Sequence, residues 1–326
     1  MKCQRCSQPA VIITANRKAL CKVHFIQAFE KRVKDTIKRC KLLSVNERIA
    51  VACSGGKDST VALYVVSRLY KDVTAIAIDE GIRGYRSKTL KDLKQFCSEH
   101  RIKLKVFSFK EEYGATLDQI VKRVRMPACR VCGILRRQVL NRHAAGFDRL
   151  VTGHNLDDEA QSILMNLLKA NTELLARLGP ITGIKPWKGF TPRVKPLYLC
   201  TEKEDAAYAI LMGFNIGFNE CPYAGSSFRS TIRQALSDLE DKHPGSKQYL
   251  VKNFLRMLPG LRKRVSMDIN KEKNKEDRCI AYCKECGQPS AGRVCAACSI
   301  IINLRAKNSS GRDTALTRVF YAVHKD

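Results

Sequence analysis

The chain has 326 residues, 44% of them hydrophobic, and its 59 lysines and arginines outnumber its 31 acidic residues, which gives a formal net charge of +28. This length accommodates one sizeable core with small appended modules, and we expect no membrane association because no apolar run approaches the length of a membrane span. The charge favours nucleic acid as a partner over a merely soluble surface. No charged segment followed by a long apolar core opens the sequence, so we expect no secretion signal and a cytoplasmic location.

Both ends of the sequence carry metal-ligand residues in close pairs, which fits a cytosolic chain whose cysteines are metal ligands or catalytic thiols rather than disulfides. The first set is Cys3, Cys6, Cys21 and His24, and the second is Cys283, Cys286, Cys295 and Cys298. Each set offers the four ligands of a closed tetrahedral zinc site, and scattered buried or redox thiols would rarely produce this spacing twice. We predict two structural Zn²⁺ modules whose folding depends on the metal.

Between these modules, short apolar segments alternate with amphipathic ones. The predicted strands are 47–53, 73–79, 103–109 and 149–154, and the predicted helices are 59–70, 88–100 and 157–170. This alternation predicts an α/β fold with a doubly wound parallel sheet that is covered by helices on both faces. Ligands of such sheets bind beyond the carboxyl ends of the strands, where segments 54–59 and 153–158 fall.

The sequence predicts six segments in chain order. They are an N-terminal zinc module (1–28), a basic helical linker (29–46), the α/β domain (47–225), a helical basic region (226–278), a C-terminal zinc module (279–302) and a basic tail (303–326). Within the fourth segment, residues 262–278 are predicted to form a solvated linker. The basic strings at 31–43 and 136–143 fit nucleic-acid phosphate contacts and solvated helix faces equally well.

The loop "SGGKDS" at 54–59 directly follows a predicted buried strand. Its two glycines allow a sharp turn in which backbone N–H groups converge, and the next helix adds its positive N-terminal end. Glycines are also common in ordinary strand-to-helix turns, but this combination of residues is more specific than that.

This loop resembles that of the PP-loop ATP pyrophosphatases, which cleave ATP between the α and β phosphates and adenylate a substrate. The resemblance implies that the loop grips pyrophosphate, with Mg²⁺ at the phosphates, Lys57 neutralising their charge and Asp58 orienting the loop or the metal. The ATP-binding residues it implies are Ala52, Ser54, Gly55, Gly56, Lys57, Asp58, Ser59, Ile78, Gly153 and His154.

Three further cysteines lie between the two terminal modules, two of them close together and the third much later in the chain. Cys129 and Cys132 lie close together in "PACRVCG", and Cys221 follows much later in "NECPYA". By spacing alone the first two are half a zinc site or a redox pair, and Cys221 is as easily a small packed residue. The remaining cysteines show no metal-ligand spacing, and we interpret them as structural: Cys40, Cys53, Cys97, Cys200 and Cys279.

Together with both terminal modules and "TGHNLDDEA" at 152–160, these motifs resemble the tRNA 2-thiouridine synthetases of the archaeal, thermophile and eukaryotic-cytosolic group. The resemblance implies that Cys129, Cys132 and Cys221 hold three irons of a [4Fe-4S] cluster, with the fourth iron open to sulfide. The catalytic residues it implies are Asp158, Lys57, Asp58 and Arg136. Arg136 and Arg137 stand where the family often has lysine, and an arginine does not readily lose a proton.

The implied reaction adenylates the C2 oxygen of a tRNA uridine and replaces it with sulfur. The implied partners are tRNA, a sulfur donor (a ubiquitin-like thiocarboxylate protein or sulfide) and a second copy in a homodimer. One alternative is a tRNA 2-thiocytidine synthetase or another PP-loop tRNA-modifying ligase. Another is a non-catalytic, zinc-dependent nucleic-acid-binding protein, which explains the charge and the terminal modules but not "SGGKDS".

Overall fold

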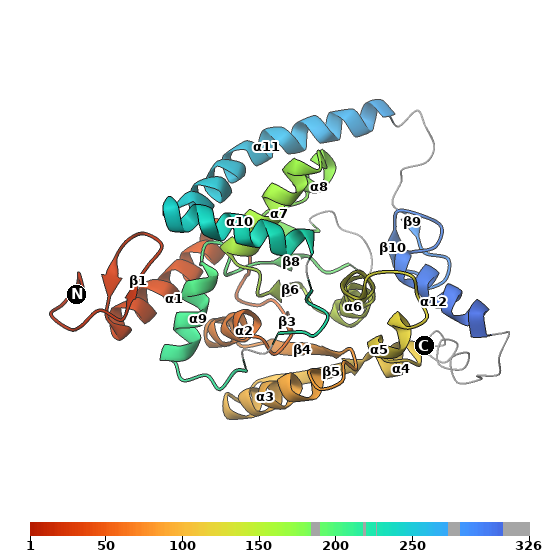
Figure 1. The fold of residues 1–326 in the computed structure, drawn as a ribbon, viewed down its shortest axis with the longest axis horizontal. Coiled ribbons are helices and arrows are strands. Elements are labelled where there is room, and N and C mark those ends of the chain that lie inside the picture. The colour runs from red at the N-terminus through yellow and green to blue at the C-terminus, as the bar shows by residue number, and fades with distance from the viewer. Residues whose placement is uncertain (184–189, 218–219, 226, 273–280, 309–326) are drawn as a thin grey trace.

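A six-stranded sheet forms the centre of the computed structural model, which describes residues 1–183, 190–217, 220–225, 227–272 and 281–308 (Figure 1). The strand order is β5-β4-β3-β6-β8-β7, and every neighbouring pair is parallel except β7 with β8. The strands are β3 (Ile49–Cys53), β4 (Val73–Asp79), β5 (Lys103–Ser108), β6 (Arg149–Thr152), β7 (Ile181–Thr182) and β8 (Arg193–Val194). The predicted α/β fold is confirmed.

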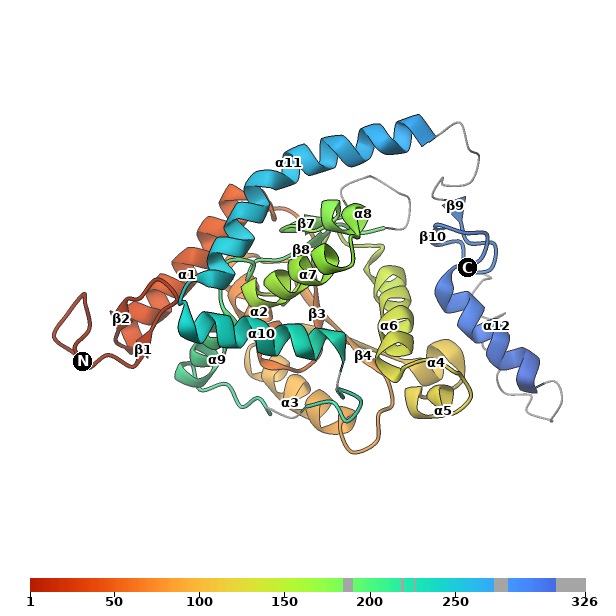
Figure 2. The same ribbon diagram turned by 45° about the horizontal axis from the view of Figure 1, so that its top comes forward.

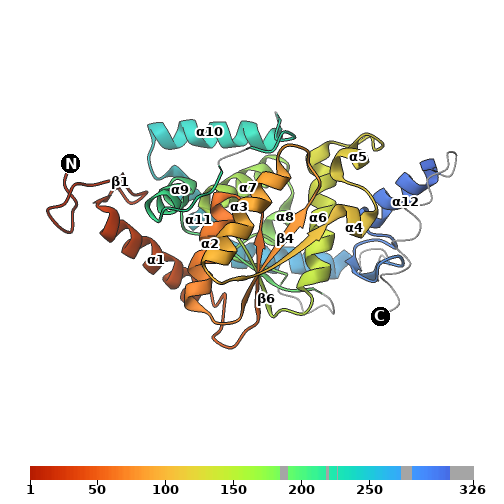
Figure 3. The same cartoon turned by 90° about the horizontal axis from the view of Figure 1, so that it is seen from below.

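Alternate residues of β3 face opposite layers of helices, as the period of a strand requires. Ile49 and Val51 belong to one buried cluster, and Ala50 belongs to the other. The first layer contains α1 (Lys22–Arg39), α2 (Lys57–Leu69), α3 (Arg86–Glu99) and α9 (Glu202–Leu211). The second contains α4 (Phe109–Tyr113), α5 (Leu117–Val121), α6 (Ala128–Ala144) and α12 (Ala296–Asn308). Figure 3 views the sheet between these layers.

A third buried cluster joins four helices that follow β6. They are α7 (Leu156–Leu168), α8 (Thr172–Ala176), α10 (Phe228–Lys242) and α11 (Ser246–Glu272). Figure 2 shows α10 and α11 alongside α7. The linker predicted for 262–278 is wrong in its first part, because α11 continues to Glu272. Arg262 holds this part of α11 in place, since its guanidinium donates to the carbonyls of Ala176 (3.0 Å) and Leu178 (2.9 Å). Residues 273–280 lie outside the described part of the chain.

The two terminal modules lie at opposite ends of the molecule (Figures 1 and 3). The N-terminal module contains β1 (Ile12–Ile13) and β2 (Ala19–Leu20), and the C-terminal one contains β9 (Ala281–Tyr282) and β10 (Pro289–Ser290). Cys21 is the N-cap residue of α1, so the first module continues directly into that helix, which crosses the expected boundary at residue 28 without a break. No helix in the described ranges is both long and apolar enough to cross a bilayer.

Candidate nucleotide and cysteine site

The loop at 54–59 lies at the point where the strand order reverses. From β3 the chain proceeds through β4 and β5 on one side, and β6 lies on the other, which is where ligands of open α/β sheets bind. Gly55 has φ of 81°, and a Cβ there would stand 2.5 Å from the Thr89 carbonyl oxygen. A Cβ on Gly153, which follows β6, would stand 2.6 Å from the Ser59 nitrogen. Only glycine allows these loops to approach so closely, and α2 thereby presents its N-terminal N–H groups as a phosphate cradle.

Lys57 is half-buried between two carboxylates. Its Nζ lies 2.8 Å from Glu202 Oε1 and 3.3 Å from Asp58 Oδ2. Burial favours the neutral amine, but the adjacent Asp58 and Glu202 outweigh it and raise the pKa of Lys57. The ammonium is therefore charged at neutral pH and available to a phosphate. Glu202 was not predicted from the sequence, because only the fold brings the first turn of α9 to this loop.

Asp58 belongs to a chain of polar groups that extends into the core. Asn155 Nδ2 lies 3.4 Å from Asp58 Oδ1 and 3.0 Å from Oδ2 of the fully buried Asp205. Burial raises the pKa of Asp58, and it raises the pKa of Asp205 well above its usual range. Asn155 thus fixes the orientation of the Asp58 carboxylate while that carboxylate remains half-exposed at the site.

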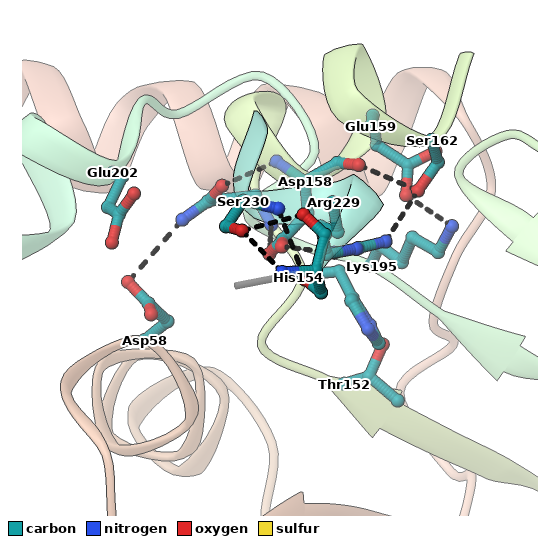
Figure 4. A network of polar contacts seen from close by, with 12 residues as sticks. Asp58, Thr152, His154, Asp158, Glu159, Ser162, Lys195, Glu202, Arg229 and Ser230 are labelled. Atoms are coloured by element: carbon teal, nitrogen blue, oxygen red, sulfur yellow. Dashed lines mark hydrogen bonds and ion pairs between the residues drawn. The ribbon is translucent and has the colours of Figure 1, made fainter. Parts of the chain in front are cut away.

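Asp158, in the first turn of α7, lies near Asp58. Its Oδ2 accepts from the backbone N–H of Asn155 (3.3 Å) in a capping box, and its Oδ1 lies 3.2 Å from Arg229 Nη1. Figure 4 shows Arg229, from α10, reaching Asp158 and Ser162 on α7. The neighbouring Asp157 points elsewhere and binds Lys247 of α11 (2.7 Å). The structure therefore gives the two aspartates different partners. Asp157 pairs with Lys247, whereas Asp158 caps α7 and also lies at the nucleotide site.

His154 lies between these groups and β6. Its Nδ1 is 2.9 Å from Thr152 Oγ1 (Figure 4). His154 as a whole is exposed, yet desolvation by the surrounding protein lowers the pKa of its ring to about 4. His154 is therefore neutral at pH 7 and suited to hydrogen bonding or stacking rather than to carrying charge.

Arg86 connects the nucleotide loop with the next strand, and it was not predicted from the sequence. Its guanidinium is buried and donates to the carbonyls of Ser54 and Ile78 (the second at 2.7 Å). It also pairs with the buried Glu80 at 2.9 Å. Glu80 in turn lies 3.5 Å from Nη1 of Arg136, which stands one turn after Cys132 on α6. The loop and the cysteine region are thus joined through buried charges. Ala52 is half-buried near the end of β3.

The three internal cysteines come together from two segments of the chain. Cys129 and Cys132 lie in the first turns of α6, and Cys129 Sγ is 3.0 Å from the Tyr223 carbonyl oxygen, which places the Cys221 loop beside that helix. Cys132 and Cys221 pack against the same buried cluster. Burial raises the pKa of Cys132 to about 11, so a bound metal would replace a proton there.

This cysteine arrangement fits a cluster better than a single ion. Among the described residues, the groups of at least three ligand atoms within 4.8 Å of one another are the two terminal sets, which do not include Cys129, Cys132 or Cys221. Irons at separate corners of a cube require their thiolates to stand farther apart than ligands of one ion. The donor set, three thiols and a nearby Arg136 that opposes a cluster's negative charge, suits iron and sulfide.

Each terminal set converges as predicted on a site of zinc size. Cys21 Sγ lies 3.4 Å from His24 Nδ1 and 3.7 Å from Cys6 Sγ, and Cys286 Sγ lies 3.8 Å from Cys295 Sγ. Sulfurs at about 2.3 Å from one tetrahedral zinc stand roughly 3.8 Å apart, so both sets fit such an ion. The predicted structural cysteines Cys53, Cys97 and Cys200 are buried, and Cys279 lies outside the described residues.

Comparisons with known proteins agree with these motifs. The PP-loop domain model matches residues 24–239. The chain is 40% identical over 302 residues to the tRNA-5-methyluridine(54) 2-sulfurtransferase of Pyrococcus horikoshii, with 91% of this chain and 93% of that protein covered. It is 37% identical over 314 residues to the cytoplasmic tRNA 2-thiolation protein 1 of Aspergillus niger, with 93% and 88% covered.

A solved structure agrees with these sequence relatives. The U34-tRNA thiolase NcsA from Methanococcus maripaludis, solved with its [4Fe-4S] cluster, is 34% identical and superposes with a TM-score of 0.75 over 93% of this chain and 96% of that chain. This chain therefore belongs to the PP-loop family, in the group formed by the tRNA 2-thiolation sulfurtransferases.

Proposed function

We propose that this protein is an ATP-dependent tRNA sulfurtransferase that converts the C2 carbonyl of a tRNA uridine to a thiocarbonyl, releasing AMP and pyrophosphate. The observation that carries the proposal is the joining of a PP-loop cradle to a three-cysteine site through Arg86 and Glu80. A pyrophosphate-binding loop alone would fit many ligases, and three cysteines alone would fit many metal sites. Their connection through these buried charges supports activation and sulfur transfer on the same base.

The chemistry needs ATP because a carbonyl oxygen is a poor leaving group. The uridine oxygen attacks the α-phosphorus, the bond from that phosphorus to the bridging oxygen breaks, and pyrophosphate departs into the loop at 54–59. Sulfide then attacks C2, and the bond from C2 to oxygen breaks as AMP leaves with that oxygen. Lys57 and the N–H groups of α2 neutralise the departing charge, and Asp58 would help to hold a Mg²⁺ ion at the phosphates.

Residues around the loop position the substrate. Asp158 and His154 lie in the polar network that Figure 4 shows together with Asp58 of the phosphate cradle, and Arg229 holds Asp158 in its orientation at 3.2 Å. Ala52, Ile78 and the glycines border the adenosine side of the site by their positions at the strand ends. In this arrangement catalysis rests on positioning and charge neutralisation.

Cys129, Cys132 and Cys221 would hold a [4Fe-4S] cluster, which supplies an iron-bound sulfur position when it is loaded. Arg136 stands beside these thiols and keeps its charge at all accessible pH values, so its role is to attract an anionic sulfur species rather than to move a proton. The two terminal sites hold Zn²⁺ as structural ions. The sulfur comes from a thiocarboxylate protein or from free sulfide, and the active form is a homodimer.

The experiment that tests this function combines product analysis with nucleoside mapping. Cluster-loaded protein, ATP, sulfide and unmodified tRNA should yield 2-thiouridine together with AMP and pyrophosphate. Mass spectrometry of nuclease fragments would locate the modified uridine at position 34, as the NcsA name indicates for that relative, or at position 54, as the Pyrococcus name indicates. Release of ADP and phosphate, or thiolation of cytidine alone, would overturn the proposal.

A further inference from the structure

A groove of about 260 Å³ lies between the N-terminal zinc module and α1, at the end of the molecule far from the cysteine site (Figure 1). Of the charged side chains that border it, five are basic and one is acidic. They are Arg5, Lys18, Lys31, Arg32, Arg39 and Asp35. Neither ATP binding nor the cysteine chemistry uses any of them.

Ion pairs neutralise only part of this charge. Lys31 pairs with Asp35 at 3.2 Å on the surface of α1, and Arg32 pairs with the buried Glu204 at 2.5 Å. The exposed side chains of Arg5, Lys18 and Arg39 form no ion pair with any described residue. Three uncompensated cations therefore share one groove, where they repel one another and favour an anionic occupant.

Contacts within the protein hold the walls of the groove in place. One wall is the β1–β2 hairpin, which the zinc ligands anchor, and Cys21 joins that module to α1 as its N-cap residue. Glu204 ties both walls together, since it accepts from the backbone N–H of Ala15 (3.3 Å) as well as from Arg32. Leu20 and Thr36 lie buried at the base. A rigid groove loses little entropy when it binds its ligand.

The same short helix connects this groove to the nucleotide loop. In the first turn of α9, Glu202 contacts Lys57 of the loop at 2.8 Å, while Glu204, two residues later, contacts Arg32 of the groove at 2.5 Å. An occupant of the groove would thus lie one helix away from the ATP site. This position suits a long substrate that reaches into the site from the side.

We propose that this groove binds the phosphodiester backbone of the tRNA substrate, an inference that rests on the function proposed above. The unpaired cations are exposed at the rim, as a polyanion requires, whereas tight capture of one small anion would need buried donors aimed inward. Among the described residues that line the groove none is aromatic, so these residues offer no surface for base stacking. Contacts of this kind position an RNA and add salt-dependent affinity without reading its sequence.

The test compares two double variants that lose the same charge. Lys18→Ala/Arg39→Ala removes two groove cations, and Lys34→Ala/Lys38→Ala removes two exposed lysines of α1 that do not line the groove. We measure the tRNA dissociation constant of each full-length protein over a range of salt concentrations. The groove variant should bind about 10-fold more weakly at 0.1 M salt, and its log–log salt slope should fall by ~1.5, since each lost phosphate contact removes about 0.7 to 0.9.

Zinc content and ATP binding of both variants serve as controls for folding. Equal losses of tRNA affinity in the two variants would overturn the inference, because net charge alone would then explain the effect. Weaker binding of inorganic phosphate or AMP with unchanged tRNA affinity would also overturn it and assign the groove to a small anion. If the wild-type protein itself neither binds nor thiolates tRNA, the proposed function fails, which is a different result from either of these.

Discussion

Gln138 donates its side-chain amide to the sulfurs of the C-terminal metal set. Its Nε2 lies 3.3 Å from Cys286 Sγ, 3.5 Å from Cys298 Sγ and 3.6 Å from Cys295 Sγ. The other end of the same amide, Oε1, accepts from the Tyr113 hydroxyl at 2.8 Å. Gln138 is buried on α6, the helix that begins with the cysteines of the internal site. The C-terminal cysteine module thus docks on the helix that carries Cys129 and Cys132.

This contact predicts that Gln138→Leu speeds the loss of zinc from the C-terminal site. An N–H donor reduces the negative charge on zinc-bound thiolates, and outer contacts of this kind commonly contribute 10- to 100-fold to metal affinity. We expect at least about 10-fold faster release of one zinc to a colorimetric chelator. The N-terminal zinc is an internal control, because nothing near it changes. Unaltered release of both ions would contradict the prediction.

The internal cysteines give a second prediction. Cys129→Ala, Cys132→Ala or Cys221→Ala should abolish thiolation and lower the iron content after anaerobic reconstitution, while both zinc ions remain. Cys283→Ser should have the opposite pattern, with lower zinc content and thermal stability, since that site has no open position for chemistry. Metal analysis together with the thiolation assay distinguishes the three internal variants from Cys283→Ser. Full iron content with full activity in any of the three alanine variants would exclude the cluster.

The nucleotide loop gives a third prediction. Asp58→Ala and Ser59→Ala should each reduce AMP formation by at least about 100-fold with little change in tRNA affinity, because the loop contacts pyrophosphate and tRNA binding is spread over many basic residues. Lys57→Ala should reduce AMP formation by a smaller factor, since the backbone cradle remains after one charge is lost. Release of AMP and pyrophosphate is measured with cognate tRNA. A fall in tRNA affinity as large as the fall in AMP formation would contradict this division of roles.

The sequence predicted those parts of the molecule that depend on local pattern. Strand–helix alternation predicted the sheet, and paired ligand spacing predicted which residues converge at each end. The sequence did not reveal the roles of Glu202, Arg86 or Gln138, because each contacts a group more than thirty residues away. Nothing in the local sequence marks a residue that the fold brings to a distant site. The expected linker at 262–278 was wrong over its first part for a related reason: a basic, polar string looks solvated unless the carbonyls that Arg262 binds are known.

The buried carboxyl of Asp205 gives the last prediction, which concerns stability and pH. Burial raises the pKa of Asp205 well above its usual range, the nearby Asp58 adds to the effect, and Oδ1 of Asp205 has no hydrogen-bond partner in the described structure. The folded state therefore holds this proton more tightly than the unfolded chain does. Its stabilising contribution is fully present below about pH 3.9, the ordinary value of an aspartate, and is lost as pH rises through the folded pKa.

Asp205→Asn keeps an acceptor for Asn155 and removes the ionisation. We expect urea unfolding midpoints of the wild-type protein to fall, relative to those of the variant, as pH rises from 5 to 8, because each unit of raised pKa is equivalent to about 1.4 kcal/mol. Asp35→Asn is the matched control, since Asp35 is exposed on α1 and should follow the wild type. Parallel pH profiles for the wild type and Asp205→Asn would show that the buried carboxyl titrates normally. Divergence confined to Asp205→Asn would locate the pH sensitivity beneath the nucleotide loop, where Asn155 links Asp205 to Asp58.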